Sequence, residues 1–319
     1  NLTGLLYVSH KPYNYRCISR VKNAIHCYSG HGFSDKHTAE FRLASAYDYV
    51  MRPDTVGTQR FSAADIPLDP SRFLLIGGLP VEGLRYEPEP RKLKNVLYAP
   101  TWEGHDEEVN FSSVFDVTDR FQEFISGSGN LSFRPHPALG KKRKHVDDAK
   151  KKILKIAHKA EQKADAFNAS DILISDISGV LPEYLFTGKP IIIPVPADSW
   201  KRGYIKKTDL ENYCYIWDPK ATSLRDFLAR ISDDPKREAR LAKRHQRFLG
   251  SQNLDDLCSH FDSALNLMEQ ANQQRTLKAI SSGAGSIGSD ADFDSLPDGS
   301  EMRKIVSEIK SGRRILGED

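Results

Sequence analysis

Short apolar runs of strand length recur along the first 200 residues, and stretches with helical character separate them. The runs span residues 5–8, 24–28, 47–51, 73–78, 96–99, 131–135, 171–175 and 190–195. Strands that alternate with helices in this way are typical of parallel sheets built from β-α-β units. The pattern predicts an α/β protein, and no internal repeat of fixed period accompanies it.

A change in composition divides the chain. Residues 78–93 are rich in proline, glycine and charge, which indicates a linker and a domain boundary near residue 90. We expect Rossmann-like domains over residues 1–90 and 91–270, the second ending in helices over residues 224–231, 236–248 and 254–270. Residues 271–319 are small, polar and turn-prone, and they predict a flexible tail with a short basic helix over residues 301–314.

The composition is that of a globular protein. The chain has 319 residues, 39% hydrophobic and 28% charged, with a mean hydropathy of −0.52, and no apolar run approaches the roughly 20 residues that span a bilayer. The four cysteines have no C-x-x-C spacing, which favours reduced thiols in a cytoplasmic protein over a zinc site. The chain starts at Asn1 without a signal-peptide pattern or an initiator Met, so we expect it to be a piece of a longer polypeptide.

Basic residues concentrate between Lys141 and Lys163, where ten Lys or Arg face three acids. Two interpretations remain open for this stretch: a solvated helix face, or a patch for anionic lipid or a polyanionic polymer.

The segment SDISG follows a buried strand and begins a helix. A helix start at the carboxyl edge of a parallel sheet presents unpaired N–H groups to a phosphate. Ser178 adds a hydroxyl donor and Gly179 permits close approach, while Ser175 and Asp176 complete the turn. Ordinary N-capping explains the same residues equally well.

Two further loops follow strands in the same way. In YAPTWEG, Thr101 and Trp102 would line a ligand cleft and Glu103 would accept from hydroxyls, although a buried Trp plugging the loop is as good an interpretation. In RPHP, His136 lies between two prolines and behind Arg134, and the pair would stabilise charge on a transferring phosphoryl group. An incidental turn histidine is the alternative.

In SGHGFSDK, His31 lies between two glycines after a strand, as suits a general base, although a structural histidine gives the same pattern. Lys189, in the turn GKP, is expected to be solvated. The combination of two histidine loops with one phosphate-type helix start predicts an interdomain cleft that handles a nucleotide-linked phosphate, with one histidine on each wall.

Four segments, HGFSDK, LYAPTWEG, RPHP and SDISGVLPEYLFTGKPI, lie in this order over roughly residues 5–250. Together they resemble the CDP-glycerol:poly(glycerophosphate) glycerophosphotransferase family, the teichoic-acid and capsule polymerases with a GT-B fold. Gly179 stands where the family usually has the second serine of a pair, and HGFSDK lacks the usual preceding Trp. The first domain is also short, as if its opening strands lay upstream of Asn1.

The resemblance implies a role for each matched residue. His31 would activate the acceptor hydroxyl, with Gly32 and Lys36 beside it. His136, helped by Arg134, would steady the donor phosphates. The pyrophosphate would lie against Ser178 and Gly179, with Ser175 and Asp176 in the same motif. Thr101 and Trp102 would line the cleft, and Glu103 would contact the glycerol moiety.

The implied reaction is attack of an acceptor hydroxyl on the β-phosphate of CDP-glycerol, or a related CDP-polyol, with release of CMP. It implies no metal or other cofactor and no nucleic acid partner. The acceptor would be a lipid-linked polymer, so a peripheral contact between the Lys141–Lys163 stretch and the inner face of the cell membrane becomes as good an interpretation as a solvated helix face. Two alternatives remain open: a GT-B glycosyltransferase or epimerase using a UDP-sugar, and a truncated non-catalytic module that binds nucleotide or polymer.

Overall fold

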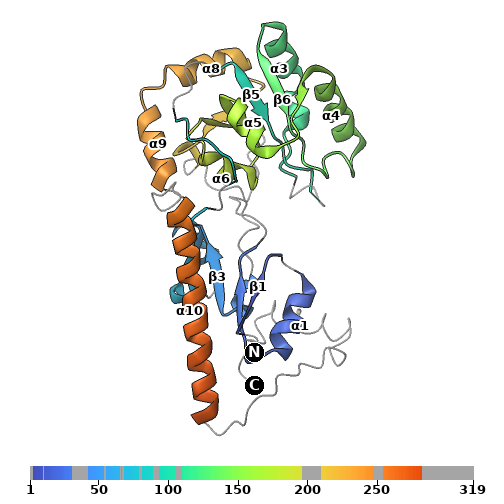
Figure 1. The fold of residues 1–319 in the computed structure, drawn as a ribbon. Helices are drawn as coiled ribbons and strands as arrows, with labels where there is room; N and C mark the ends of the chain where they lie inside the picture. Colours follow the sequence, from blue (N-terminus) through green and yellow to red (C-terminus); the bar gives the residue numbers. More distant parts are fainter. Residues whose placement is uncertain are drawn as a thin grey trace. The chain divides into compact units, whose positions relative to one another are not determined.

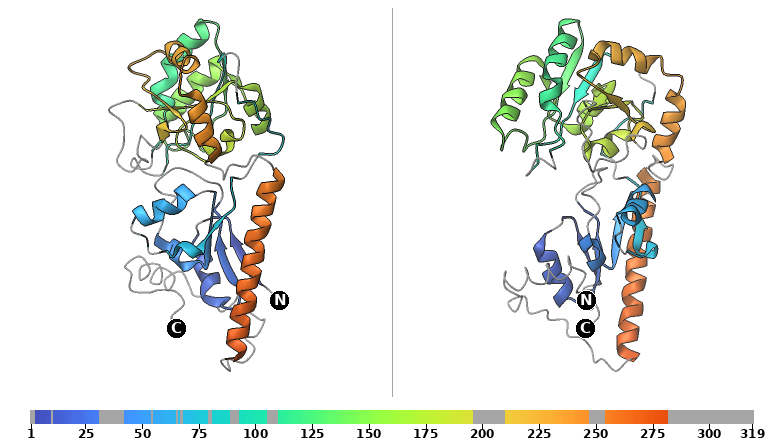
Figure 2. Two further views of the ribbon diagram at one scale, coloured as in Figure 1. Left: turned by 90° about the vertical axis from the view of Figure 1, so that its left-hand side faces the viewer. Right: turned by 180° about the vertical axis from the view of Figure 1, so that it is seen from behind.

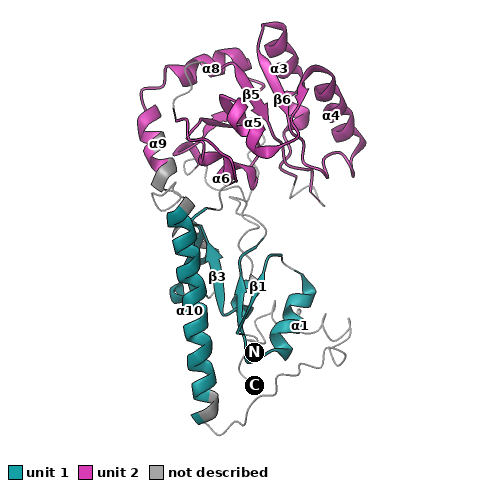
Figure 3. Cartoon of the chain, in the orientation of Figure 1, with its two compact units in different colours: residues 1–33, 40–78, 253–319 teal, residues 34–39, 79–252 magenta. Residues whose placement is uncertain are grey.

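The computed structural model (Figure 1) describes residues 3–9, 11–30, 42–53, 55–64, 66, 68–78, 81–88, 93–104, 110–195, 210–246 and 254–281. They form two compact units (Figure 3). Unit 1 takes the described residues between 3 and 78 together with helix α10 (Leu254–Ser281), and unit 2 takes those between 81 and 246. Each unit holds one sheet whose described strands all pair in parallel, which confirms the predicted α/β class with parallel sheets.

Unit 1 is built on a sheet with the strand order β1-β2-β3-β4. Its elements before residue 78 are β1 (Gly4–Tyr7), α1 (Pro12–Arg20), β2 (Ile25–Tyr28), η2 (Arg42–Ala46), β3 (Tyr49–Arg52), α2 (Thr55–Ala63), η3 (Pro70–Arg72) and β4 (Phe73–Leu75). Side chains alternate between the two faces. Cys27 packs with Met268 of α10, whereas its neighbour Tyr28 joins the cluster that contains Tyr15 of α1. The sheet therefore lies between α1 and α10 (Figure 2).

Helix α10 belongs to unit 1, which differs from the predicted division at residues 91–270. It buries Leu257, Ala264 and Met268 at helical spacing, and it contacts β1, β2 and β4. Arg275 fixes its last turns, since its guanidinium lies 2.6 Å from the Asp48 carboxylate and donates to a backbone carbonyl at 2.8 Å. Residues 271–281 therefore continue the helix and are not part of a flexible tail. Residues 282–319, with the expected basic helix over residues 301–314, lie outside the described residues.

Unit 2 contains a six-stranded sheet with the order β10-β9-β8-β5-β6-β7. Its elements are β5 (Asn95–Tyr98), α3 (Val114–Ser126), β6 (Asn130–Phe133), α4 (Lys144–Ile156), β7 (His158–Lys159), α5 (Lys163–Ala169), β8 (Ile172–Ile174), α6 (Val180–Leu185), β9 (Ile191–Pro194), β10 (Tyr215–Trp217), α8 (Leu224–Ser232) and α9 (Arg237–Gln246). The chain runs outward from β5 to β7, returns to β8, and then runs outward the other way. This reversal is the doubly wound arrangement, and it places the topological switch point at the carboxyl ends of β5 and β8, which is called the crevice edge here because sheets of this type bind ligands in a crevice at that position.

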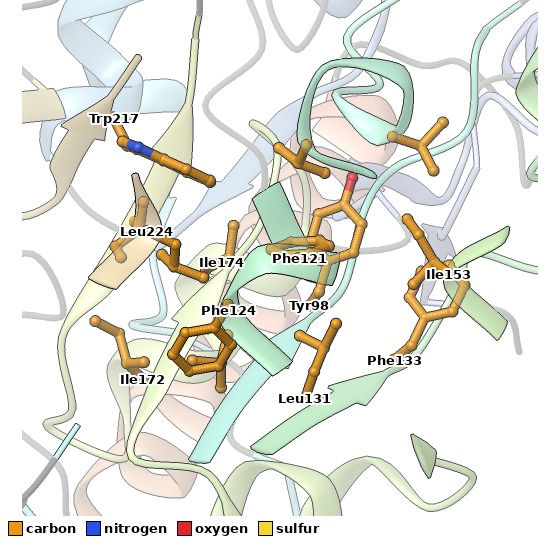
Figure 4. Close-up of a cluster of buried hydrophobic side chains, with 14 of the residues drawn as sticks. Tyr98, Phe121, Phe124, Leu131, Phe133, Ile153, Ile172, Ile174, Trp217 and Leu224 are labelled. Atoms are coloured by element: carbon orange, nitrogen blue, oxygen red, sulfur yellow. The ribbon is translucent and has the colours of Figure 1, made fainter. Parts of the chain in front are cut away.

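The core of unit 2 fixes that edge in place (Figure 4). Helix α3 packs Val117, Phe121 and Phe124 against the sheet, and the rings of Phe121 and Tyr98 meet edge to face at 4.7 Å. Helices α4 and α8 extend the same cluster. The alternate position Leu97 faces the other side, where α5 and α6 pack on β5 and β9. Both faces of the sheet are therefore covered, and its described strands are held rigidly.

All eight predicted strands overlap observed ones, while the very short β7 and β10 were not expected. The polar linker behaves differently from the prediction of a boundary near residue 90. Its described part, residues 81–88, is tied to unit 2: Glu87 N donates to Thr187 O at 2.7 Å, and Arg85 N donates to Asn168 Oδ1 at 2.9 Å. The division between the units consequently falls after Gly78.

Candidate functional site

Three of the sequence motifs meet at the crevice edge of unit 2. The loops that follow β5, β6 and β8 carry residues 99–104, 134–140 and 175–179. Backbone hydrogen bonds continue past the strand ends, from Ala99 N to Ile174 O and from Arg134 N to Tyr98 O, both at 2.9 Å. The motifs YAPTWEG, RPHPALG and SDISG therefore start side by side. Ligands of doubly wound sheets bind at this position.

Asp176 holds two of these loops together. Its carboxylate accepts hydrogen bonds from Thr101 N at 2.8 Å and from Ser113 N, just before α3, at 3.0 Å. Ser175 supports the same corner by donating to Ala99 O at 2.7 Å. Asp176 is 2% exposed and Ser175 fully buried. Both buried residues thus hold the loops in place through hydrogen bonds to backbone groups. The SDISG motif alone did not distinguish this structural role from direct contact with a phosphate.

Ser178 and Gly179 begin helix α6. Ser178 Oγ accepts from Val180 N at 3.3 Å and lies 3.4 Å from Ser175 Oγ, while Gly179 is half-buried at the N-cap. Ser178, the residue before the N-cap, thus satisfies one N–H group in the first turn of α6. Helix α6 has only six residues, so the field at its start comes from local N–H groups and less from a macrodipole.

Glu103, the residue predicted to contact the glycerol moiety, is fully buried. Its carboxylate reaches the neighbouring loop and accepts from Gly140 N at 2.8 Å and from Lys142 N at 3.0 Å. Burial alone would raise the pKa of Glu103, but these backbone donors outweigh it and lower the pKa, so the group is ionised near neutrality. These hydrogen bonds show that Glu103 supports the neighbouring loop.

Trp102 stacks on His136, with ring centroids 6.2 Å apart and an angle of 22° between the planes. Lys142 Nζ lies 5.8 Å from the centre of the indole. His136 is exposed, and its Nδ1 accepts from Ala138 N at 3.1 Å. The neutral imidazole therefore carries its proton on Nε2. Trp102 is only half-buried and its indole stacks on the His136 ring, so it does not fill the loop as a fully buried side chain would.

Arg134 brings a permanent positive charge to the same edge. It directly follows β6 and is half-buried, and its Nε is buried without a hydrogen-bond partner among the described residues. Buried donors are rarely left unsatisfied. Arg134 is therefore the side chain at this edge whose geometry best suits an anionic ligand.

The prediction that Lys189 is solvated is wrong. The side chain is 2% exposed, and its Nζ donates to the carbonyls of Phe167, Asn168 and Ser170 at 2.8–3.2 Å. Glu87 lies 3.0 Å from the same Nζ. Turn chemistry at GKP gave no signal of this role, because the carbonyls belong to the end of α5, some 20 residues away.

His31, Gly32 and Lys36 lie outside the described residues. The structure does describe the preceding strand end, where Ser29 N and Gly30 N both donate to Tyr7 O. No cluster of three or more metal-ligating side chains occurs among the described residues, and no disulfide joins the four cysteines, all of which are described. Within the same part of the chain, no helix is both long and apolar enough to cross a membrane.

The two parallel-sheet units and the crevice-edge motifs define an α/β protein of GT-B type. Solved structures agree on the fold. The wall teichoic acid polymerase TagF matches with a TM-score of 0.54 at 16% identity, over 86% of this chain and 73% of that one. A UDP-GlcNAc 2-epimerase from Neisseria meningitidis matches with a TM-score of 0.53 at 9% identity, over 82% and 76%.

The family model of CDP-glycerol:poly(glycerophosphate) glycerophosphotransferases matches residues 85–253, just over half of the chain. The chain belongs to this family, as its motifs predicted, and is of the glycerophosphotransferase type. No curated protein sequence matches the chain.

Proposed function

We propose that the protein transfers glycerol phosphate, or a related polyol phosphate, from a CDP-activated donor to a hydroxyl of a cell-wall or capsule polymer, with release of CMP. The observation that carries this proposal is the meeting of YAPTWEG, RPHPALG and SDISG at the crevice edge of unit 2, within the part of the chain that the family model matches.

The donor phosphates would bind at that edge. Arg134 supplies fixed positive charge, His136 a donor at Nε2, and the start of α6 the N–H group of Gly179. These groups would stabilise the negative charge that builds up on the β-phosphate and on the departing CMP. Thr101 contributes the loop backbone that Asp176 anchors.

The reaction would be an in-line displacement. The acceptor oxygen forms a bond to the β-phosphorus while the bond from that phosphorus to the bridging oxygen breaks, and CMP leaves with the bonding electrons. The acceptor hydroxyl loses its proton to His31, the proposed general base, with Gly32 and Lys36 in the same motif. General-base catalysis of this kind typically contributes about 10²–10⁴-fold in rate.

The polymer acceptor would be lipid-linked, and α4 would bring the enzyme to the inner face of the cell membrane. Asp147 is paired with Lys150 and Lys151 at 2.6 Å, while Lys152 and Lys155 remain exposed on the same helix. Each exposed Lys near an anionic surface contributes about 1 kcal/mol.

Vesicle co-sedimentation tests the membrane contact. Changing Lys152 and Lys155 to Glu should weaken binding to vesicles rich in phosphatidylglycerol. The matched change of Lys236 and Lys243, exposed lysines at α9, should not. Equal binding by both double variants would contradict the membrane role of α4.

A donor screen tests the reaction. With a glycerol phosphate oligomer as acceptor, the protein should release CMP from CDP-glycerol or another CDP-polyol and should leave UDP-sugars intact. Turnover of UDP-sugars alone would replace the proposal with a glycosyltransferase or epimerase. Nucleotide binding without turnover would indicate a non-catalytic module.

A further inference from the structure

We infer that Glu103 is a positioning residue: its buried carboxylate holds the RPHPALG loop so that His136 is presented to the donor phosphate. This inference rests on the proposed function for its catalytic consequence, but not for its structural basis.

Both oxygens of the Glu103 carboxylate bind the loop that follows β6. One oxygen accepts from Gly140 N at 2.8 Å and the other from Lys142 N at 3.0 Å. Gly140 has φ +77°, and a Cβ there would lie 2.8 Å from the Asp147 backbone. The backbone conformation at Gly140 is therefore tightly restricted, and the hydrogen bond from Gly140 N to Glu103 stabilises it.

The position of Gly140 is linked to that of His136 by a hydrogen-bonded turn. Leu139 N donates to His136 O at 2.9 Å, and Ala138 N donates to His136 Nδ1 at 3.1 Å. These bonds form a tight turn that ends at Gly140. A shift of the backbone at Gly140 would therefore also move the imidazole of His136. Trp102, the residue before Glu103, stacks on the same ring, so two adjacent side chains fix the loop at both ends.

The charge of Glu103 strengthens this contact. Backbone N–H donors lower the pKa of Glu103, so its carboxylate is ionised and accepts from the Gly140 and Lys142 amides more strongly than a neutral amide oxygen would. Glu103→Gln keeps the shape of the side chain, but its NH₂ group must face one of the two backbone donors.

The domain offers a matched control. Asp171 also anchors backbone amides with a carboxylate, since its Oδ2 accepts from Lys94 N at 2.9 Å and from Asn95 N at 2.7 Å. It does so at the amino end of β5, the opposite edge of the sheet. Asp171→Asn therefore removes the same type of interaction without touching the RPHPALG loop.

The experiment compares CMP release from CDP-glycerol by the wild type, Glu103→Gln and Asp171→Asn, at a temperature where circular dichroism shows all three folded. Glu103→Gln should lower kcat/KM about 10- to 100-fold, the scale of a displaced catalytic group. Asp171→Asn should stay within about twofold of the wild type. Equal rates for the two variants would overturn the inference.

A second measurement needs no variant and no turnover. In the wild type, the amides of Gly140 and Lys142 should exchange with solvent far more slowly than the amide of Lys144, an exposed residue at the first position of α4, where the N–H group has no intrahelical acceptor. Fast exchange at both positions would overturn the inference even in an active enzyme. Absence of CMP release by the wild type, with slow exchange retained, would instead contradict the proposed function alone.

Discussion

Replacing Lys189 with Met should strongly destabilise unit 2. Met keeps most of the length and apolar stem of the side chain but removes its ammonium. The change takes the donor away from three carbonyls at the end of α5 and from Glu87.

The contacts give the magnitude. The Phe167 carbonyl keeps the Ser170 hydroxyl as a donor at 3.0 Å, so the Asn168 and Ser170 carbonyls carry most of the loss. A buried acceptor left unsatisfied costs about 1–3 kcal/mol. The ion pair adds little, because Glu87 is 49% exposed. We expect a loss of about 3–5 kcal/mol in the free energy of unfolding.

Urea unfolding followed by tryptophan fluorescence isolates this effect, because all three tryptophans lie in the stretch of unit 2. Lys159→Met is the control: Lys159 is paired with Glu161 at the same 3.0 Å, but both side chains are more than half exposed. It should change stability by less than about 0.5 kcal/mol. If Lys189→Met lies within about 1 kcal/mol of that control, the burial argument is refuted.

Three further predictions concern single contacts. Arg275→Met should loosen the end of α10, seen as faster amide exchange there, and combining it with Asp48→Asn should add little, because the pair acts together. Burial lowers the pKa of His26 below its ordinary 6.5, so the unfolded chain binds the proton first. Unit 1 should keep this contribution above about pH 6.5 and lose it as the pH falls through the folded-state pKa. Amide protection factors in unit 1, which correct for the pH dependence of intrinsic exchange, should therefore fall between pH 7 and pH 5, and constant protection factors would contradict this. Gly140→Ala should lower CMP release at least as much as Glu103→Gln, because its Cβ would meet the backbone of Asp147, and unchanged release would contradict the restricted backbone conformation assigned to that loop.

Much of the fold follows from local pattern. Apolar runs of strand length marked eight strands, because buried parallel strands are nearly continuous in Val, Ile and Leu. Local apolar patterns did not predict which unit α10 and the linker pack against. The same buried face of α10 would suit either sheet, and only the three-dimensional partners of Leu257 and Met268 decide that it packs on unit 1.

The candidate site shows a similar limit. The motifs placed polar residues after strands, and strand order then brought their loops to one edge. The motifs did not indicate which of these side chains would be exposed to solvent. Glu103, Asp176 and Lys189 are polar residues in turns, where solvent is the usual environment, yet each is satisfied by backbone groups distant in sequence. Long-range partners of this kind leave no periodic signal.

The central claim is that the RPHPALG loop handles the phosphates of a CDP-activated donor. The most direct test is the rate of CMP release from CDP-glycerol by the wild type, His136→Ala and His158→Ala, in which His158 is an exposed histidine on β7 of the same unit. We predict that the wild type and His158→Ala release CMP at equal rates, and that His136→Ala releases it at least about 10²-fold more slowly. Equal rates in all three proteins would contradict it.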